Sequence, residues 1–105
     1  MAEVPVQIIK LSKKFVEEAL KDDIHISQAV LFGSYARGTY QKFSDIDLAV
    51  VSEDFTGSSF YDSKKLIKAM LRTSIEIEVH TYRPEDFTPT NPFVREILNN
   101  GIRIV

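Results

Sequence analysis

Two short groups of residues in the first half of the chain carry side chains that could do chemistry. They are the glycine-bounded stretch Gly33-Ser34-Tyr35-Ala36-Arg37-Gly38 and, six residues further on, the acidic pair in Ser44-Asp45-Ile46-Asp47-Leu48. Backbone N–H groups exposed at Gly33, with the Ser34 hydroxyl and the Arg37 guanidinium, are donors suited to a phosphate. Asp45 and Asp47 would project from the same face of a strand, and their mutual repulsion favours a divalent cation such as Mg²⁺ or Mn²⁺.

The glycine stretch differs from the better-known nucleotide-binding loops. Gly33 and Gly38 have the spacing of the outer glycines of a P-loop, but Thr39 and Tyr40 replace the Lys and Ser/Thr that it needs. No glycine lies two residues after Gly33, so the dinucleotide-binding fingerprint is absent as well. A tight turn that uses the glycines only for their backbone angles is the alternative, and the neighbouring acids favour the phosphate interpretation over it.

The elements that must position these groups alternate between helices and strands. Apolar residues recur at three- and four-residue spacing from Ile8 to Leu20, which predicts an amphipathic helix whose charged face, including Glu17 and Glu18, is solvated. The further predicted elements are strands at 26–32, about 45–51, 75–80 and 102–105, loops at 34–39 and 52–59, and helices at 63–72 and from Pro92 to Gly101, with Asn91 as the N-cap. This order predicts an α/β or α+β fold with one small mixed sheet flanked by helices.

The predicted strand at 75–80 has an acidic polar face. Its apolar residues alternate with Glu76, Glu78 and His80, which is the period-two pattern of a strand. This polar face is unusually acidic. A lone histidine at a strand end is more typical of a half-buried polar residue than of a catalytic group, so His80 is not placed among the catalytic residues.

Composition excludes several classes of protein. The chain has 105 residues, which suits one domain, and its net charge of -2 disfavours a protein that coats nucleic acid. It contains no cysteine, which excludes disulfides, thiol nucleophiles and Cys-ligated zinc. The longest purely apolar runs are four residues long, so we expect a cytoplasmic protein without a membrane span or signal peptide.

The glycine stretch and the acidic pair together carry a resemblance. The residues Gly33-Ser34-x-Ala36-Arg37-Gly38 and Ser44-Asp45-x-Asp47-Leu48 resemble the signature of the DNA polymerase β-like nucleotidyltransferase superfamily, and most closely its minimal nucleotidyltransferase branch. The resemblance covers most of the chain, because the strand before Gly33, the helix after the acids and the acidic strand follow in the order that this family uses. It implies a single nucleotidyltransferase domain over residues 1–105 with the polymerase β-like fold.

The resemblance also implies a metal centre. In that family a third carboxylate on a neighbouring strand joins the aspartate pair around two metal ions. Asp45, Asp47 and Glu78 are therefore the expected catalytic ligands of two Mg²⁺ ions, with Mn²⁺ as the alternative. Glu78 is preferred to Glu76 because the downstream segments Pro84-Glu85-Asp86-Phe87 and Asn91-Pro92-Phe93 resemble a subgroup that carries its last acid there. The usual third residue is aspartate, so the glutamate leaves a shifted metal site or a reduced activity open.

The expected nucleotide-binding residues are Gly33, Ser34 and Arg37, and the expected nucleotide is ATP. By resemblance the reaction is transfer of a nucleoside monophosphate, here AMP, to a protein or other acceptor. The chain is too short for the substrate-selecting domains of larger relatives, so another polypeptide or a second copy of the chain should bring the acceptor. Minimal family members are often encoded beside an α-helical HEPN (higher eukaryotes and prokaryotes nucleotide-binding) protein, and some such pairs act as toxin and antitoxin.

A different class of function stays open at this point. The chain could be a non-catalytic nucleotide-binding module or an antitoxin that neutralises its partner by contact alone. The residues do not separate this alternative from the enzyme, nor do they identify the acceptor, the base or the oligomeric state.

Overall fold

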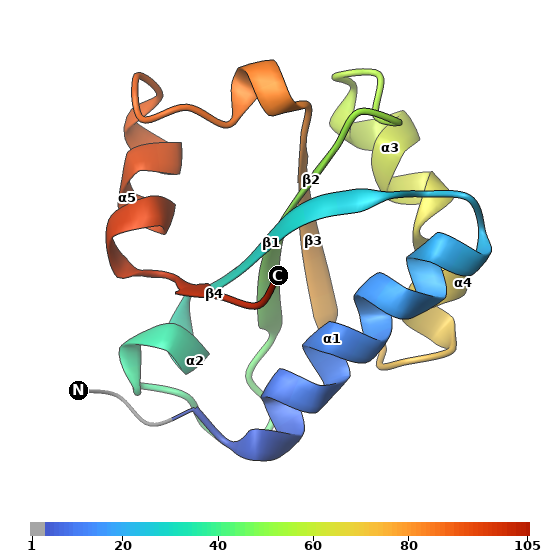
Figure 1. The fold of residues 1–105 in the computed structure, drawn as a ribbon. Helices are drawn as coiled ribbons and strands as arrows, with labels where there is room; N and C mark the ends of the chain where they lie inside the picture. The colour runs from blue at the N-terminus through green and yellow to red at the C-terminus, as the bar shows by residue number, and fades with distance from the viewer. Residues whose placement is uncertain (1–3) are drawn as a thin grey trace.

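The computed structural model describes residues 4–105, and its centre is a mixed four-stranded sheet in the order β3-β2-β1-β4 (Figure 1). The strands are β1 (Ile26–Phe32), β2 (Ile46–Ser52), β3 (Ile77–Tyr82) and β4 (Ile102–Arg103). β1 runs antiparallel to both β2 and β4, whereas β2 and β3 run parallel. This mixed sheet with its helices confirms the α+β class that the sequence predicts.

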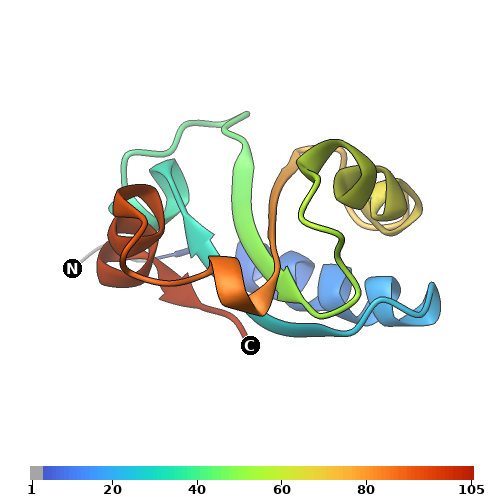
Figure 2. The same cartoon turned by 90° about the horizontal axis from the view of Figure 1, so that it is seen from above.

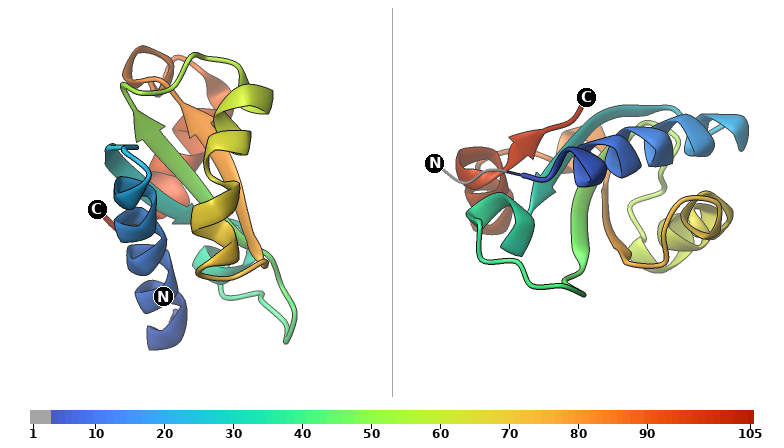
Figure 3. Two further views of the ribbon diagram at one scale, coloured as in Figure 1. Left: turned by 90° about the vertical axis from the view of Figure 1, so that its right-hand side faces the viewer. Right: turned by 90° about the horizontal axis from the view of Figure 1, so that it is seen from below.

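Helices cover both faces of the sheet. α1 (Val6–Lys21), α3 (Ser59–Lys65) and α4 (Ile67–Leu71) lie on one face, where α1 contacts α4 (Figure 3). α5 (Pro92–Asn100) lies on the other side of β2 and β3 from α3 and α4 (Figure 2). The single turns α2 (Ser34–Arg37) and η1 (Pro84–Asp86) follow β1 and β3.

The strand β2 is buried from both sides. Leu48 and Val50 belong to the larger core, which α1 and the α3–α4 segment cover, and Ala49 and Val51 belong to a second core under α5. An apolar run that is buried on both faces is typical of an inner strand between helical layers. β2 is therefore held firmly, and with it the acidic residue Asp47 at its beginning.

The first and last helices agree with the sequence. α1 includes the predicted span of residues 8–20, and the Asn91 side-chain oxygen caps α5 by accepting hydrogen bonds from the N–H groups of Phe93 at 2.9 Å and Val94 at 3.4 Å. Gly101 ends α5 with a φ of -80°, which any residue adopts. Glycine is needed there for space, because a Cβ would collide with the Ile97 carbonyl and the side chain of Val30.

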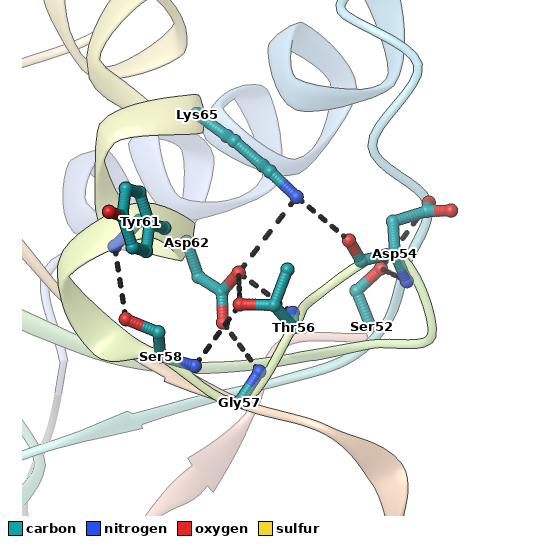
Figure 4. Close-up of polar contacts among 8 residues, drawn as sticks. All are labelled: Ser52, Asp54, Thr56, Gly57, Ser58, Tyr61, Asp62 and Lys65. Carbon is teal, nitrogen blue, oxygen red and sulfur yellow. Dashed lines mark hydrogen bonds and ion pairs between the residues drawn. The ribbon is translucent and has the colours of Figure 1, made fainter.

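The helix predicted at 63–72 is wrong in its bounds, since two short helices, α3 and α4, meet at Leu66. α3 begins earlier because the Ser58 hydroxyl accepts a hydrogen bond from the N–H of Tyr61. The buried carboxylate of Asp62 then accepts hydrogen bonds from the N–H groups of Thr56 at 2.8 Å and Gly57 at 3.0 Å, and from the Thr56 hydroxyl (Figure 4). Asp62 thus fastens the loop after β2 to α3, and Lys65 of α3 adds a hydrogen bond to the Asp54 carbonyl at 3.2 Å.

Three further predictions need correction. Residues 34–37 form α2 instead of a loop, and β3 covers 77–82 instead of 75–80. The shift of β3 arises because residues 74–76 turn first: the N–H of Ile77 donates to the Ser74 carbonyl at 3.3 Å, and Ile75 is 78% exposed. The last strand is also shorter than predicted, and ends at Arg103.

Glu18 is buried, contrary to the solvated helix face that the charge pattern predicts. Its carboxylate accepts a hydrogen bond from Lys21 at 2.7 Å and another from Arg72, just after α4, also at 2.7 Å. Arg72 additionally donates to Asp22 at 2.8 Å. This partly buried ion pair links α1 to the end of α4.

None of the helices in residues 4–105 combines the length and the apolar character that crossing a membrane requires.

We predict that Asp62→Asn destabilises the protein by about 2 kcal/mol, because an amide NH₂ group would then face backbone N–H donors inside the protein. Urea unfolding of the variant should show this as a lower midpoint with an unchanged slope. Asp23→Asn is the matched control, since Asp23 is exposed, and asparagine tolerates its positive φ of 63°. Equal midpoints for Asp62→Asn and the control would show that the loop does not depend on this carboxylate.

We also predict an acid-sensitive contribution from Glu18. Hydrogen bonds from Lys21 and then Arg72 lower the pKa of Glu18 below its ordinary value. A carboxyl with a lowered folded-state pKa stabilises the fold above its unfolded pKa of about 4.3, and this contribution is lost as the pH falls through the lower folded value. The free energy of unfolding should therefore fall less steeply below about pH 4 in Glu18→Gln than in the wild type. Glu17→Gln, at the exposed neighbour, should follow the wild-type pH profile.

Candidate active site

The pairing of β2 with β3 places an aspartate beside a glutamate. Asp47 of β2 is the register partner of Glu78 of β3, and Ala49 is the partner of His80. Because side chains alternate along a strand, Asp47, Glu78 and His80 share one face of the sheet. It is the face that α5 covers, since Ala49 belongs to the core under that helix.

These three side chains form a compact group of possible metal ligands. One ligand atom from each of Asp47, Glu78 and His80 lies within 4.8 Å of the other two. The His80 Nε2 atom is 3.8 Å from Asp47 Oδ1 and 4.0 Å from Glu78 Oε1, which is too long for a hydrogen bond. Neither carboxylate is therefore hydrogen-bonded to the His80 imidazole.

The electrostatics of Asp47 reflect this crowding. Burial raises the pKa of its carboxyl above the ordinary value, and the negative charges of Glu78 and Asp45 raise it further, whereas His80 acts in the opposite direction. A charged Asp47 is therefore unfavourable unless a cation comes close. Two carboxylates and one imidazole are ligands that divalent metal ions accept, so the group fits a metal ion in both charge and donor type.

A cleft of about 320 Å³ opens above this group, between the sheet and α5. Its walls come from the end of β1, from α2, from β2 and β3, and from α5. The lining residues are Phe32, Gly33, Ala36, Arg37, Asp47, Glu78, His80, Phe93, Glu96, Ile97 and Asn100. The acidic group therefore has direct access to a space large enough for part of a small ligand.

Gly33 lies against the Asp47 carboxylate at the edge of this cleft. Its backbone has a φ of 77° and a ψ of -150°, a combination that is essentially restricted to glycine. A Cβ at this position would collide with Asp47 Oδ2. Gly33 is therefore required both for the backbone turn into α2 and for the space beside Asp47.

Most of the residues predicted from the sequence meet in this cleft. Asp47, Glu78, Gly33 and Arg37 line it, whereas Ser34 and Asp45 are not among its lining residues. Asp45 is exposed and precedes β2 by one residue, so it is not on the strand with Asp47 as predicted, although its charge still acts on Asp47.

The structure distinguishes the two candidate glutamates by position. Glu78 is in β3 directly beside Asp47, whereas Glu76 lies in the turn before β3 and is outside the group of possible ligands among residues 4–105. The backbone carbonyl of Glu76 accepts a hydrogen bond from the N–H of Ile46 at 2.8 Å, which starts the pairing of the two strands. Glu76 thus has a structural contact near the site, and Glu78 is the glutamate that faces Asp47.

Sequence reasoning left His80 out of the site, and the structure places it there. The alternation of the strand already put His80 on the same face as Glu78, but its distance from Asp47 depends on how β3 pairs with β2. The α5 residues Phe93, Glu96 and Asn100 were missed for a similar reason, because a helix covering this face is a tertiary feature.

Comparisons with known proteins found a matching family model and similar sequences. The family model of the nucleotidyltransferase domain matches residues 9–104. A protein of Methanocaldococcus jannaschii named "Putative protein adenylyltransferase MJ0141" is 31% identical over 101 residues, which is 94% of this chain and 97% of the relative. A second protein of that organism, named "Putative protein adenylyltransferase MJ1379", is 28% identical over 97 residues, which is 91% of this chain and 89% of the relative.

Two solved structures share the fold. A nucleotidyltransferase structure from Sulfolobus solfataricus, described as putative, has a TM-score of 0.67 and 19% identity, over 93% of this chain and 79% of the other. A structure described as "Crystal structure of the toxin-antitoxin with AMP-PNP" has a TM-score of 0.54 and 23% identity, over 87% of this chain and 70% of the other. The chain therefore belongs to the nucleotidyltransferase domain family, in agreement with the minimal nucleotidyltransferase that its motifs predict.

Proposed function

We propose that this chain acts as one nucleotidyltransferase domain that, with a divalent metal, transfers AMP from ATP to a protein acceptor. The observation that carries the proposal is the pairing of Asp47 with Glu78, next to Gly33, at the floor of a cleft. Two like charges held together in this way are unfavourable without a cation, and a nucleoside triphosphate brings its own metal. The names of the two curated relatives support adenylate as the transferred group and protein as the acceptor class.

In this proposal Asp47 and Glu78 hold the metal, and Asp45 completes the set from the segment before β2. Bound Mg²⁺, as one ion or two, or Mn²⁺ in its place, would neutralise phosphate charge and polarise the α-phosphorus. The absence of a Cβ at Gly33 lets the turn into α2 lie directly against the Asp47 carboxylate. The Ser34 hydroxyl and the Arg37 guanidinium then donate hydrogen bonds to phosphate oxygens, which orients the triphosphate.

The reaction requires an acceptor aligned with the α-phosphate. An oxygen of the acceptor forms a bond to the α-phosphorus, the bond between that phosphorus and the bridging oxygen breaks, and pyrophosphate leaves. The acceptor's proton goes to solvent or to a nearby carboxylate. The chain's own residues supply alignment and charge, and these are the main contributions a protein makes to a displacement of this type.

The acceptor is proposed to be an α-helical protein of the HEPN type in the cytoplasm, bound as the toxin of a toxin–antitoxin pair. The structural neighbour whose description contains both a toxin-antitoxin and AMP-PNP supports a link between this fold, a partner and an ATP analogue. As the alternative, a second copy of the chain would bring the acceptor.

A contact-acting module is the second candidate function. It is favoured by Glu78, which stands where the family usually has aspartate, and by the exposed position of Asp45 outside the compact ligand group. Such a module would bind nucleotide and inhibit its partner without transferring AMP.

Asp47→Asn should lower AMP transfer by at least about 100-fold, because it removes charge at the centre of the site while preserving shape. The assay measures label from α-labelled ATP, with Mg²⁺ or Mn²⁺, on macromolecules of a lysate from the source cell or on the purified partner. Asp23→Asn, at an exposed aspartate away from the cleft, is the control and should label as the wild type does.

Undiminished labelling by Asp47→Asn would contradict the assigned site. Partner inhibition that persists in Asp47→Asn, with no label transferred by the wild type, would replace the enzyme with the contact-acting module. A loss of folding in Asp47→Asn would also contradict the proposal, because removing one of two adjacent like charges should relieve repulsion.

Gly33→Ala should destabilise the fold by about 1–3 kcal/mol and abolish nucleotide binding. The backbone conformation at this position is disfavoured for alanine, and the added Cβ would collide with Asp47. Urea unfolding and titration with AMP-PNP and Mg²⁺ measure the two effects. Gly38→Asn is the control: Gly38 has a φ of 76° and a ψ of 15°, a left-handed conformation that asparagine tolerates. Wild-type nucleotide affinity in Gly33→Ala would show that the phosphates bind elsewhere.

A further inference from the structure

We propose that His80 is a metal ligand together with Asp47 and Glu78, and that its imidazole nitrogen makes this centre prefer Mn²⁺ to Mg²⁺. The inference rests on the proposed function only in placing a metal ion in the same cleft. It assigns a role to a residue that lies beside the expected carboxylate ligands and differs from them in chemistry.

The first observation is the position of the His80 Nε2 atom. It is buried and has no hydrogen-bond partner, although it points to the place where the Asp47 and Glu78 carboxylates meet. A buried polar atom without a partner is unfavourable, so its environment needs an explanation. A cation bound between the three side chains would satisfy the nitrogen and neutralise both carboxylates.

The second observation is the spacing of the donor atoms. Atoms that bind one ion at about 2.1 Å are separated from one another by about 3 to 4.2 Å, depending on the coordination angle. His80 Nε2 lies 3.8 Å from Asp47 Oδ1 and 4.0 Å from Glu78 Oε1, inside this interval. The same distances exceed those of a hydrogen bond, so the imidazole is not hydrogen-bonded to either carboxylate.

The third observation is that aromatic rings orient the imidazole. The Phe32 ring packs edge-on against the His80 ring with centroids 4.9 Å apart, and the Phe93 ring of α5 lies 6.2 Å away. Phe32 and Phe93 also contact each other, at 5.9 Å. These phenyl rings restrict rotation of the imidazole, so its Nε2 atom stays directed at the carboxylates.

The donor set determines the metal preference. Mg²⁺ strongly favours oxygen ligands and water, whereas imidazole nitrogen suits transition metal ions. Mn²⁺ accepts carboxylate oxygen and imidazole nitrogen alike and binds any given nitrogen ligand less tightly than the later metals do. Replacing one oxygen position with His80 therefore favours Mn²⁺ over Mg²⁺ at this site.

The test measures metal binding to the full chain without nucleotide. Mn²⁺ binding is followed by electron paramagnetic resonance, and Mg²⁺ is measured by its competition with Mn²⁺. We expect the wild type to bind Mn²⁺ more tightly than Mg²⁺, and to show electron spin-echo modulation from an imidazole ¹⁴N nucleus. In His80→Asn the ¹⁴N modulation should vanish and Mn²⁺ affinity should fall by about 10-fold or more, whereas Mg²⁺ affinity should change far less.

The matched control is His25→Asn, at the chain's other histidine. His25 is exposed and contacts Asp54, with its Nδ1 atom 3.1 Å from Asp54 Oδ2, so it lies outside the ligand group. This variant should retain both the ¹⁴N modulation and the Mn²⁺ affinity. A second variant, His80→Asp, provides an all-oxygen set and should shift the preference toward Mg²⁺; it also serves if His80→Asn does not fold.

Mn²⁺ binding without ¹⁴N modulation in the wild type would overturn the inference. So would an equal loss of Mn²⁺ and Mg²⁺ affinity in folded His80→Asn, because that pattern indicates a purely structural histidine. Since no nucleotide is present, ¹⁴N coordination combined with a failure of AMP transfer would reject the proposed function and leave this inference standing. AMP transfer without ¹⁴N coordination would reject this inference and leave the proposed function standing.

Discussion

The site depends on one constraint, the parallel register that holds Asp47 directly beside Glu78. Backbone hydrogen bonds of the sheet fix the two α-carbons, so the two side chains start from adjacent positions on one face of the sheet. Burial and the charge of Glu78 then raise the pKa of Asp47. In the proposed function a bound cation would relieve this repulsion, and the sheet holds the two residues side by side before any ligand binds.

The rest of the molecule keeps this arrangement rigid. β2 is clamped between two cores, with Leu48 on one side and Ala49 on the other, so the strand that carries Asp47 has no freedom to slide. The ion pair between Glu18 and Arg72 and the hydrogen bonds from the loop to Asp62 fasten the helices and the loop beside the larger core. Polar groups far from the cleft therefore contribute to its geometry by fixing the sheet.

The sequence was most informative where the signal is local. The spacing of the glycines and acids, the period of α1 and the cap at Asn91 involve neighbouring residues, and these features are visible in the chain itself. The strand register is not local, which is why His80 was assigned to a half-buried structural position although it lies beside Asp47. The burial of Glu18 was mispredicted for the same reason, since its partner Arg72 is distant in the sequence. The early start of α3 depends instead on a local signal, the cap at Ser58, which the predicted span of 63–72 did not use.

Asp47, His80 and Glu78 are enclosed to different extents, which suggests different roles for them in the proposed metal centre. Asp47 is 21% exposed and His80 is 30% exposed, whereas Glu78 is 56% exposed. Asp47 lies against Gly33 and His80 lies against the phenyl rings, so in the proposed metal centre these two residues would fix the position of the ion. Glu78 has a longer and more exposed side chain, which would let it follow the ion as the coordination changes. In this proposal a glutamate in place of the usual aspartate suits a centre with two enclosed ligands, an aspartate and a histidine, and one adaptable ligand.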